Sequence, residues 1–158
     1  MKLLNSNAEI HGIDPDKIVL QKAQAKAQKY SVNIFFHKGF LSLESASDLG
    51  CFSKVVSSLV FHQTPMEEKR NILFSITKLL EPNGLLCIAD YGLQRGALMK
   101  ILFRGTVQAI DGVEDTQRNA EGCLPELMKN VGFVEVSEAQ VISTLTGSIS
   151  IYTAKLVT

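Results

Sequence analysis

The fold is decided by a stretch in the middle of the chain, LLEPNGLLCIADYG (Leu79–Gly92). Its segment Glu81–Gly84 combines proline, asparagine and glycine, which is the composition of a turn. Leu85–Ala89 follows as an unbroken apolar run that ends at Asp90, and such runs are typical of strands covered on both faces of a sheet. The stretch therefore predicts a turn and a buried strand. A helix is predicted before them, because apolar residues recur at helical spacing at Ile72, Leu73, Ile76, Leu79 and Leu80.

Outward from this stretch, the sequence alternates between strand and helix. Thr64–Glu67 matches a capping box with Pro65 at the first helical position, so the helix is predicted to begin there. A parallel return between strands needs a crossover of about a dozen residues or more, so the alternation predicts an α/β fold with a parallel sheet between helices. The other predicted elements are strands over Ala8–Ile13, Val32–Phe36 and Phe52–Leu59 and a helix over Lys17–Tyr30.

The C-terminal part of the chain departs from this parallel pattern. A short helix is predicted over Leu124–Val131, with Gly132 at its C-terminal end. Strands over Phe133–Ile142 and Ser148–Val157 are joined by only about five residues, too few for a crossover helix. These two strands must therefore form an antiparallel hairpin. The region before this helix has poor periodicity, apart from a helical piece over Ala97–Phe103, and is predicted to be an insertion or lid.

Composition excludes several classes of protein. The 158 residues carry 16 basic and 16 acidic side chains, so no broad positive field favours nucleic acid or a membrane surface. Residues 1–7 lack the apolar core of a signal peptide, which predicts a cytoplasmic protein. No internal linker divides the chain, so a single domain over residues 1–158 is expected. Reduced thiols and no metal site are also expected, because three cysteines without a CxxC pair occur at Cys51, Cys87 and Cys123.

Five stretches together carry a family resemblance. HGIDPD (His11–Asp16), FSKVVSSLVFHQ (Phe52–Gln63) and the Leu79–Gly92 stretch resemble the second, fourth and fifth strands of class I S-adenosylmethionine (SAM)-dependent methyltransferases. VGFVEV (Val131–Val136) followed by SISIYTAK (Ser148–Lys155) resembles their C-terminal hairpin. The group concerned includes the small-molecule enzymes of ubiquinone and menaquinone biosynthesis. The resemblance implies a Rossmann-like sheet, mostly parallel with an antiparallel C-terminal hairpin, and SAM as the cofactor.

The resemblance has a gap at the front of the chain. The family begins with a strand that ends in an acidic, glycine-rich turn, followed by a helix, and the sequence contains neither the strand nor the turn. We therefore expect a methyltransferase sheet that lacks its first strand. In the family this strand lies between the second and fourth, so its absence removes a backbone partner from two strands. Either these strands close up or another chain fills the position, and the second alternative predicts a homo-oligomer.

Five residues at or after the ends of the first two predicted strands are candidates for cofactor binding. Asp14 stands where the resemblance implies an acid that accepts hydrogen bonds from both ribose hydroxyls of SAM, but it also suits the cap of the next helix. Ile13 and Pro15 would form apolar walls beside it. Gly39 and Phe40 stand where the family commonly has Gly-Asp. Phe40, in place of the acid that receives the adenine amino group, either stacks on adenine or packs in the core.

Five further candidates lie at or after the ends of the next two predicted strands, because ligands bind at the carboxyl ends of parallel strands. The resemblance implies that Ser57 and Ser58 lie near the cofactor. His62 is the candidate general base, with a structural hydrogen-bonding role as the alternative. Asp90 and Tyr91 are candidates to line the acceptor pocket, although Asp90 also suits a cap of the following turn.

Residues 93–119 correspond to the part of the family that covers the methyl acceptor. Three acidic residues there, Asp111, Glu114 and Asp115, either recognise a polar acceptor or are simply solvated. Nothing in this segment identifies the acceptor beyond a small molecule.

Three functions compete. The first is SAM-dependent methyl transfer to a small-molecule acceptor, which needs mainly alignment of the reacting atoms and exclusion of water. The second is a non-catalytic remnant that acts as an oligomerising or partner-binding module. It is favoured by the missing glycine-rich turn and by Phe40 and Ser53 in place of two acids of the family. A nicotinamide-dependent oxidoreductase ranks last, because it needs a GxGxxG motif before Asp14 and the sequence has none there.

Overall fold

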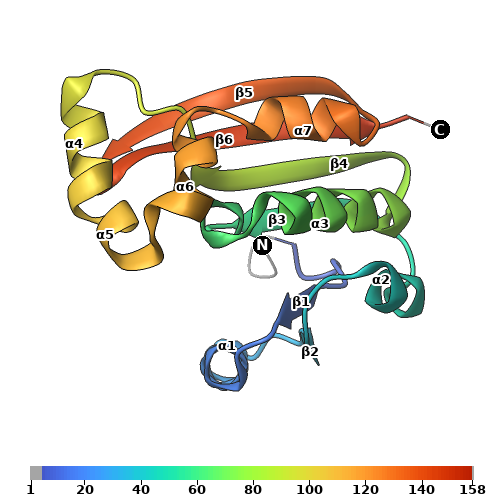
Figure 1. Cartoon of the computed structure of the whole chain (residues 1–158). Coiled ribbons are helices and arrows are strands. Elements are labelled where there is room, and N and C mark those ends of the chain that lie inside the picture. Colours follow the sequence, from blue (N-terminus) through green and yellow to red (C-terminus); the bar gives the residue numbers. More distant parts are fainter. Residues whose placement is uncertain (1–4, 158) are drawn as a thin grey trace. The chain divides into compact units, whose positions relative to one another are not determined.

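The computed structural model describes residues 5–157 (Figure 1). Residues 1–4 and residue 158 lie outside the described residues, so the N-terminal stretch on which the signal-peptide argument rests is described only in part. The chain divides into two compact units, Met1–Leu41 and Ser42–Thr158. Each unit is described by itself.

The first unit is a strand, a helix and a second strand. β1 (His11–Asp14) and β2 (Phe35–Lys38) pair in parallel, with Asp14 opposite Lys38, and α1 (Lys17–Lys29) is the crossover between them. α1 is capped by Asp16, whose carboxylate accepts the backbone N–H of Ile18 at 2.6 Å. The prediction that Asp14 caps this helix is therefore wrong. The strand predicted at Val32–Phe36 lies about two residues further along the chain.

The second unit contains a four-stranded sheet in the order β3-β4-β6-β5. β3 and β4 are parallel, whereas β4 pairs with β6, and β6 with β5, in antiparallel fashion. The predicted C-terminal hairpin is thus confirmed. The elements of this unit are α2 (Leu43–Leu49), β3 (Phe52–Ser58), the 3-10 turn η1 (Phe61–Gln63), α3 (Met66–Leu79), β4 (Leu80–Tyr91), α4 (Ala97–Gly105), α5 (Val107–Asp111), α6 (Val113–Ala120), α7 (Leu124–Asn130), β5 (Phe133–Thr144) and β6 (Gly147–Leu156).

The core of this unit lies between the sheet and two helices. Figure 1 shows α3 and α7 along the same face of the sheet. Leu73 and Ile76 of α3 and Leu86 and Ile88 of β4 are almost completely buried, whereas Leu85 is 39% exposed. β4 is therefore buried most completely on one face, although its apolar sequence predicted cover on both. Within residues 5–157, no helix has the length and apolar character needed to cross a membrane.

The local structure differs from the prediction at the start of α3 and at the start of β4. Thr64 does not cap α3, because its hydroxyl donates to the carbonyl of Val60 instead, at 2.8 Å. β4 begins at Leu80, so the predicted turn is an irregularity within the strand, where the left-handed Asn83 has a φ of 62°. In the segment predicted to have poor periodicity, the predicted helical piece is present as α4, and two further helices that were not predicted, α5 and α6, follow it.

Candidate active site

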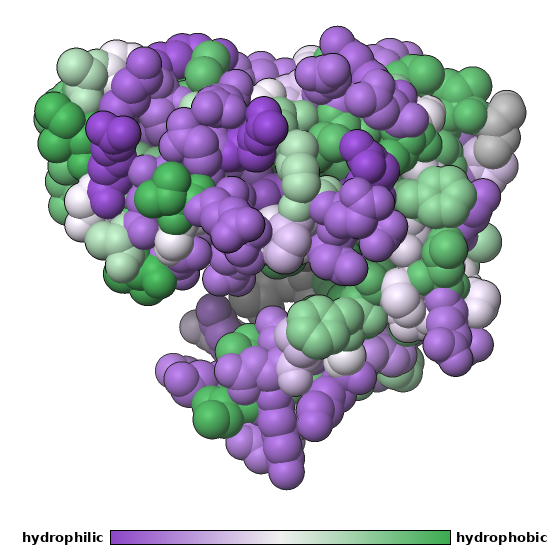
Figure 2. Space-filling model, in the orientation of Figure 1, coloured by the Kyte–Doolittle hydropathy of each residue, from purple (hydrophilic) through white to green (hydrophobic). Residues whose placement is uncertain are grey.

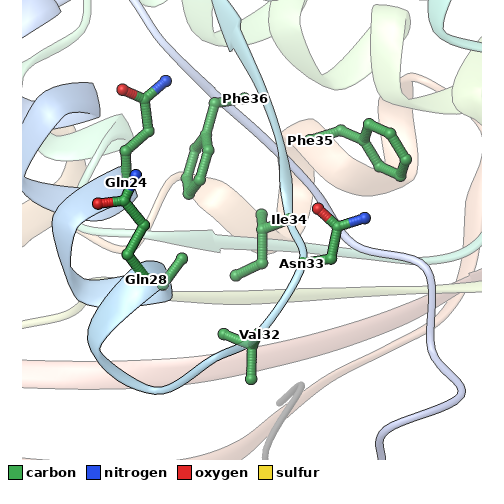
Figure 3. Close-up of a pocket in the computed structure, with 8 residues that line it drawn as sticks. Gln24, Gln28, Val32, Asn33, Ile34, Phe35 and Phe36 are labelled. Carbon is green, nitrogen blue, oxygen red and sulfur yellow. The ribbon is translucent and has the colours of Figure 1, made fainter.

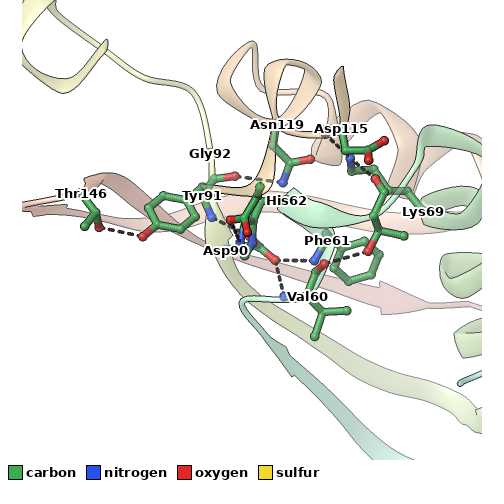
Figure 4. Close-up of polar contacts among 12 residues, drawn as sticks. Val60, Phe61, His62, Lys69, Asp90, Tyr91, Gly92, Asp115, Asn119 and Thr146 are labelled. Carbon is green, nitrogen blue, oxygen red and sulfur yellow. Dashed lines mark hydrogen bonds and ion pairs between the residues drawn. The ribbon is translucent and has the colours of Figure 1, made fainter. Parts of the chain in front are cut away.

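His62 and Asp90 form a buried pair at the ends of two neighbouring strands (Figure 4). His62 lies in η1, directly after β3, and Asp90 lies near the end of β4. The Nδ1 atom of His62 is 2.8 Å from an Asp90 carboxylate oxygen, and the side chains are 8% and 0% exposed. Because an ionised carboxylate only accepts hydrogen bonds, Nδ1 is the donor in this contact. The parallel pairing of β3 with β4 brings these two predicted residues together.

Asp90 holds the loop after β3 in place. Its second carboxylate oxygen accepts the backbone N–H groups of Val60, at 2.9 Å, and Phe61, at 2.7 Å. The oxygen that faces His62 also accepts the N–H of Tyr91 at 2.8 Å. Four donors therefore satisfy this buried charge, as an ionised group without contact to water requires. Asp90 has no side-chain surface for direct contact with an acceptor and instead orients His62.

The opposite side of the His62 ring faces the segment predicted to cover the acceptor. The Nε2 atom of His62 lies 3.5 Å from a carboxylate oxygen of Asp111, whose side chain is 26% exposed. The ring of Tyr91 packs edge-on against His62, with centroids 5.0 Å apart, and its hydroxyl is 2.7 Å from the hydroxyl oxygen of Thr146. Tyr91 is only 9% exposed, so it supports His62 from within the core.

Lys69 is a buried cation that the sequence analysis missed. Its ammonium group donates to the backbone carbonyls of Thr64, at 2.5 Å, and Asp115, at 2.8 Å, and so joins α3 to α6. Burial lowers the pKa of Lys69, and the nearby Cys123, Asp115 and Asp90 oppose this effect. The signal for its burial was its spacing, because Lys69 lies four residues before Leu73 on the apolar stripe of α3.

Two buried carboxamide side chains, those of Gln94 and Asn119, attach residues 93–119 to the sheet by hydrogen bonds. Gln94 donates to the carbonyls of Gly92 and Ser148 and accepts the N–H of Ser148, at 2.7 to 2.9 Å. Asn119 donates to the carbonyl of Tyr91 at 3.1 Å. Residues 93–119 are therefore attached to the end of β4 by buried polar contacts in addition to apolar packing.

The first unit brings together the predicted residues at the ends of β1 and β2. One carboxylate oxygen of Asp14 accepts the N–H of Asp16 at 2.8 Å, and no hydrogen bond among the described residues occupies the other. Gly39 donates its N–H to the Asp14 carbonyl at 3.1 Å, and the space where a Gly39 side chain would begin is open. Phe40 is 76% exposed, so the alternative that it packs in the core is wrong. Ile13 is half-buried and Pro15 is exposed.

Ser57 and Ser58 are the last two residues of β3. They pair with Ile88 and Ala89 of β4, so they precede the loop that carries His62 at the same end of the sheet. Ser57 is half-buried and Ser58 is exposed. Sequence reasoning thus located residues of the second unit that lie near one another, whereas it gave no reason to expect Asp111 beside His62.

A separate hollow of about 520 Å³ lies in the first unit (Figure 3). It is formed by α1 and by the chain that leads into β2, at the opposite end of β2 from Gly39. None of the predicted site residues lines it. Its lining residues are Gln24, Ala27, Gln28, Val32, Asn33, Ile34, Phe35 and Phe36.

In the part of the chain that the structure describes, neither a metal site nor a reactive thiol forms a second candidate site. No three His, Cys, Asp or Glu side chains there converge as ligands. Cys51 is exposed, and burial raises the pKa of the Cys123 thiol, which keeps this thiol protonated and unreactive.

The parallel β3–β4 pair, the antiparallel hairpin and the polar residues at the strand ends define a Rossmann-like methyltransferase fold. The chain belongs to the methyltransferase domain family, whose model matches residues 1–140. None of the curated proteins compared with the chain matches it.

Solved structures share the fold. An O-methyltransferase family protein from Burkholderia thailandensis has a TM-score of 0.77 at 13% identity, with 99% of this chain and 46% of that chain covered. Human N-acetylserotonin methyltransferase in complex with SAM has a TM-score of 0.67 at 18% identity, with 99% and 43% covered. Magnesium protoporphyrin IX methyltransferase from Synechocystis with bound SAH has a TM-score of 0.69 at 19% identity, with 98% and 67% covered. The chain spans less than half the length of the first two proteins.

Proposed function

We propose that this protein transfers a methyl group from SAM to a small-molecule acceptor. The observation that carries the proposal is the state of Asp14 at the end of β1. Asp16 supplies the helix cap, so one Asp14 oxygen keeps its capacity to accept hydrogen bonds from ribose hydroxyls. The similarity to methyltransferases with bound SAM or SAH supports this choice of cofactor.

The residues around Asp14 suit an adenosyl group. The open space at Gly39 allows a ligand to approach the backbone, and the exposed ring of Phe40 offers an aromatic face for adenine. Ile13 and Pro15 add apolar surface beside Asp14. In the second unit, Ser57 and Ser58 at the end of β3 are proposed as further cofactor-binding residues. SAM supplies an activated methyl group when it is bound.

His62 is the proposed proton acceptor. Asp90 fixes the tautomer and the orientation of its ring, and Tyr91 supports the ring from one side. A proton taken from the acceptor hydroxyl would reside on Nε2, and the carboxylate of Asp90 would stabilise the charged ring. The covering segment also exposes apolar side chains, including Leu98 and Ile110, which suit an acceptor with an apolar body. Figure 2 shows such apolar side chains at the edge where α4 and α5 lie.

Calorimetric titration of SAH into the purified protein tests the proposal. Wild-type protein is expected to bind SAH at micromolar strength, and Asp14→Ala is expected to abolish detectable binding. Asp16→Asn is the matched control, because asparagine still caps a helix and should leave binding unchanged. The proposal is wrong if wild-type protein shows neither heat nor thermal stabilisation with SAH. That result would favour the alternative of a partner-binding module.

A further inference from the structure

Asp111 covers the one nitrogen of His62 that a methyl acceptor needs. Nδ1 of His62 donates to Asp90, so the lone pair of a neutral imidazole is on Nε2. The Asp111 carboxylate lies 3.5 Å from that atom. A carboxylate has no proton to donate, so it forms no hydrogen bond with a neutral Nε2, but at this distance it blocks the approach of an acceptor hydroxyl to that atom.

Burial decreases along this row of three side chains toward Asp111. The exposed fractions are 0% for Asp90, 8% for His62 and 26% for Asp111, so Asp111 separates His62 from solvent. Asp111 is the last residue of α5, and Gly112, with a φ of 85°, joins it to α6. The carboxylate therefore lies at a junction between two short helices, and none of the described hydrogen bonds within these helices involves it.

We infer that Asp111 is a positioning residue that closes the Nε2 side of His62 until an acceptor takes its place. The role in catalysis rests on the proposed function. An acceptor hydroxyl would displace Asp111, and its proton would go to Nε2 as the O–H bond breaks. The oxygen electron pair would then form the bond to the methyl carbon while the sulfur–methyl bond breaks, so that the electron pair of that bond stays on sulfur and SAH leaves. The charge of Asp111 at the entrance favours neutral or cationic acceptors over carboxylates and phosphates.

Acylation of His62 by diethyl pyrocarbonate tests the closure without any acceptor. The reagent modifies an imidazole nitrogen that is unprotonated and accessible, and mass spectrometry of the His62 peptide gives the rate. Asp111→Asn is expected to raise this rate roughly tenfold, because reaction through a local opening scales with the population of the opened state. Asp111→Glu should restore slow labelling.

Glu114→Gln is the matched control, because it removes an acid three residues away that has no contact with His62 among those described. Its His62 rate, and the rates at His11 and His37 in every variant, should equal those of the wild type. The inference is wrong if Asp111→Asn labels His62 at the wild-type rate. It is also wrong if amide exchange rises throughout α6 in Asp111→Asn, because His62 would then be exposed by general loosening of the segment.

SAH titration of the same variants separates this inference from the proposed function. Asp111→Asn should bind SAH as the wild type does, because Asp111 is assigned to the acceptor. If no form of the protein binds SAH, the proposed function fails, while the labelling rates still decide whether Asp111 closes His62.

Discussion

Gly92, directly after β4, lies against two side chains of β6. A Cβ atom at Gly92 would lie 2.3 Å from both the Ser150 hydroxyl and the Tyr152 hydroxyl, and both side chains are buried. Gly92→Ala is therefore expected to lower the free energy of unfolding by about 1–3 kcal/mol, measured in urea. Gly105→Ala is the control, because nothing lies within 4 Å of that position. Equal effects of the two substitutions would contradict the predicted clash.

Two hydrogen bonds that Glu138 accepts make the stability of the folded protein depend on pH in the acid range. It accepts from Arg95 and from Ser150, each at 2.7 Å, and the Arg95 bond is the main reason that the pKa of Glu138 lies below its ordinary 4.5. The unfolded chain then binds this proton more readily, so the stabilisation is complete above pH 4.5 and is lost as the pH falls through the folded value.

Glu138→Gln is accordingly expected to destabilise the protein near neutral pH and to match the wild type in acid. The difference in unfolding free energy should not exceed about 1 kcal/mol, because surface ion pairs contribute little. Arg95 is 53% exposed in this pair. Urea unfolding across the acid range checks the prediction, and a difference that does not change with pH would contradict it.

At the scale of elements, the sequence predicted those parts that are marked by turns and by apolar spacing. The buried strand of β4, the helix α3 and the C-terminal hairpin are in this group. α2 was missed, because its start depends on reciprocal hydrogen bonds between Ser42 and Ser45 rather than on an apolar stripe. His62 and Asp90 were each predicted, but the contact of His62 with Asp111 depends on how α5 packs, which no local spacing encodes.

Lys69 is expected to stabilise the packing of α6 against α3 and so to slow local opening of α6. Lys69→Met removes the donor for the carbonyls of Thr64 and Asp115, so amide exchange of α6 is expected to become about tenfold faster. The β5–β6 hairpin should be unaffected. Lys78→Met, an exposed position on the same helix, is the control. Exchange measured by mass spectrometry would contradict the prediction if the two variants behaved alike.

At the scale of the whole molecule, two sheets each end in a strand with one described partner. β1 pairs only with β2 and β3 only with β4 among residues 5–157. An edge strand presents unpaired N–H and C=O groups that can pair with another chain. β5 is also an edge, but its pairing with β6 is interrupted at two places and Glu135 has a φ of 50°, which makes it a poor template.

These edges predict that the protein self-associates through β3. Light scattering is expected to give a mass above the 17.3 kDa of one chain, increasing with concentration. Val56→Lys, at a 51% exposed position of β3, should return the mass to that of a monomer, because charges on an edge strand oppose pairing. Val134→Lys, at a 39% exposed position of β5, should leave the association unchanged. A wild-type protein that stays monomeric at every concentration would rule out a second copy as the partner of β3.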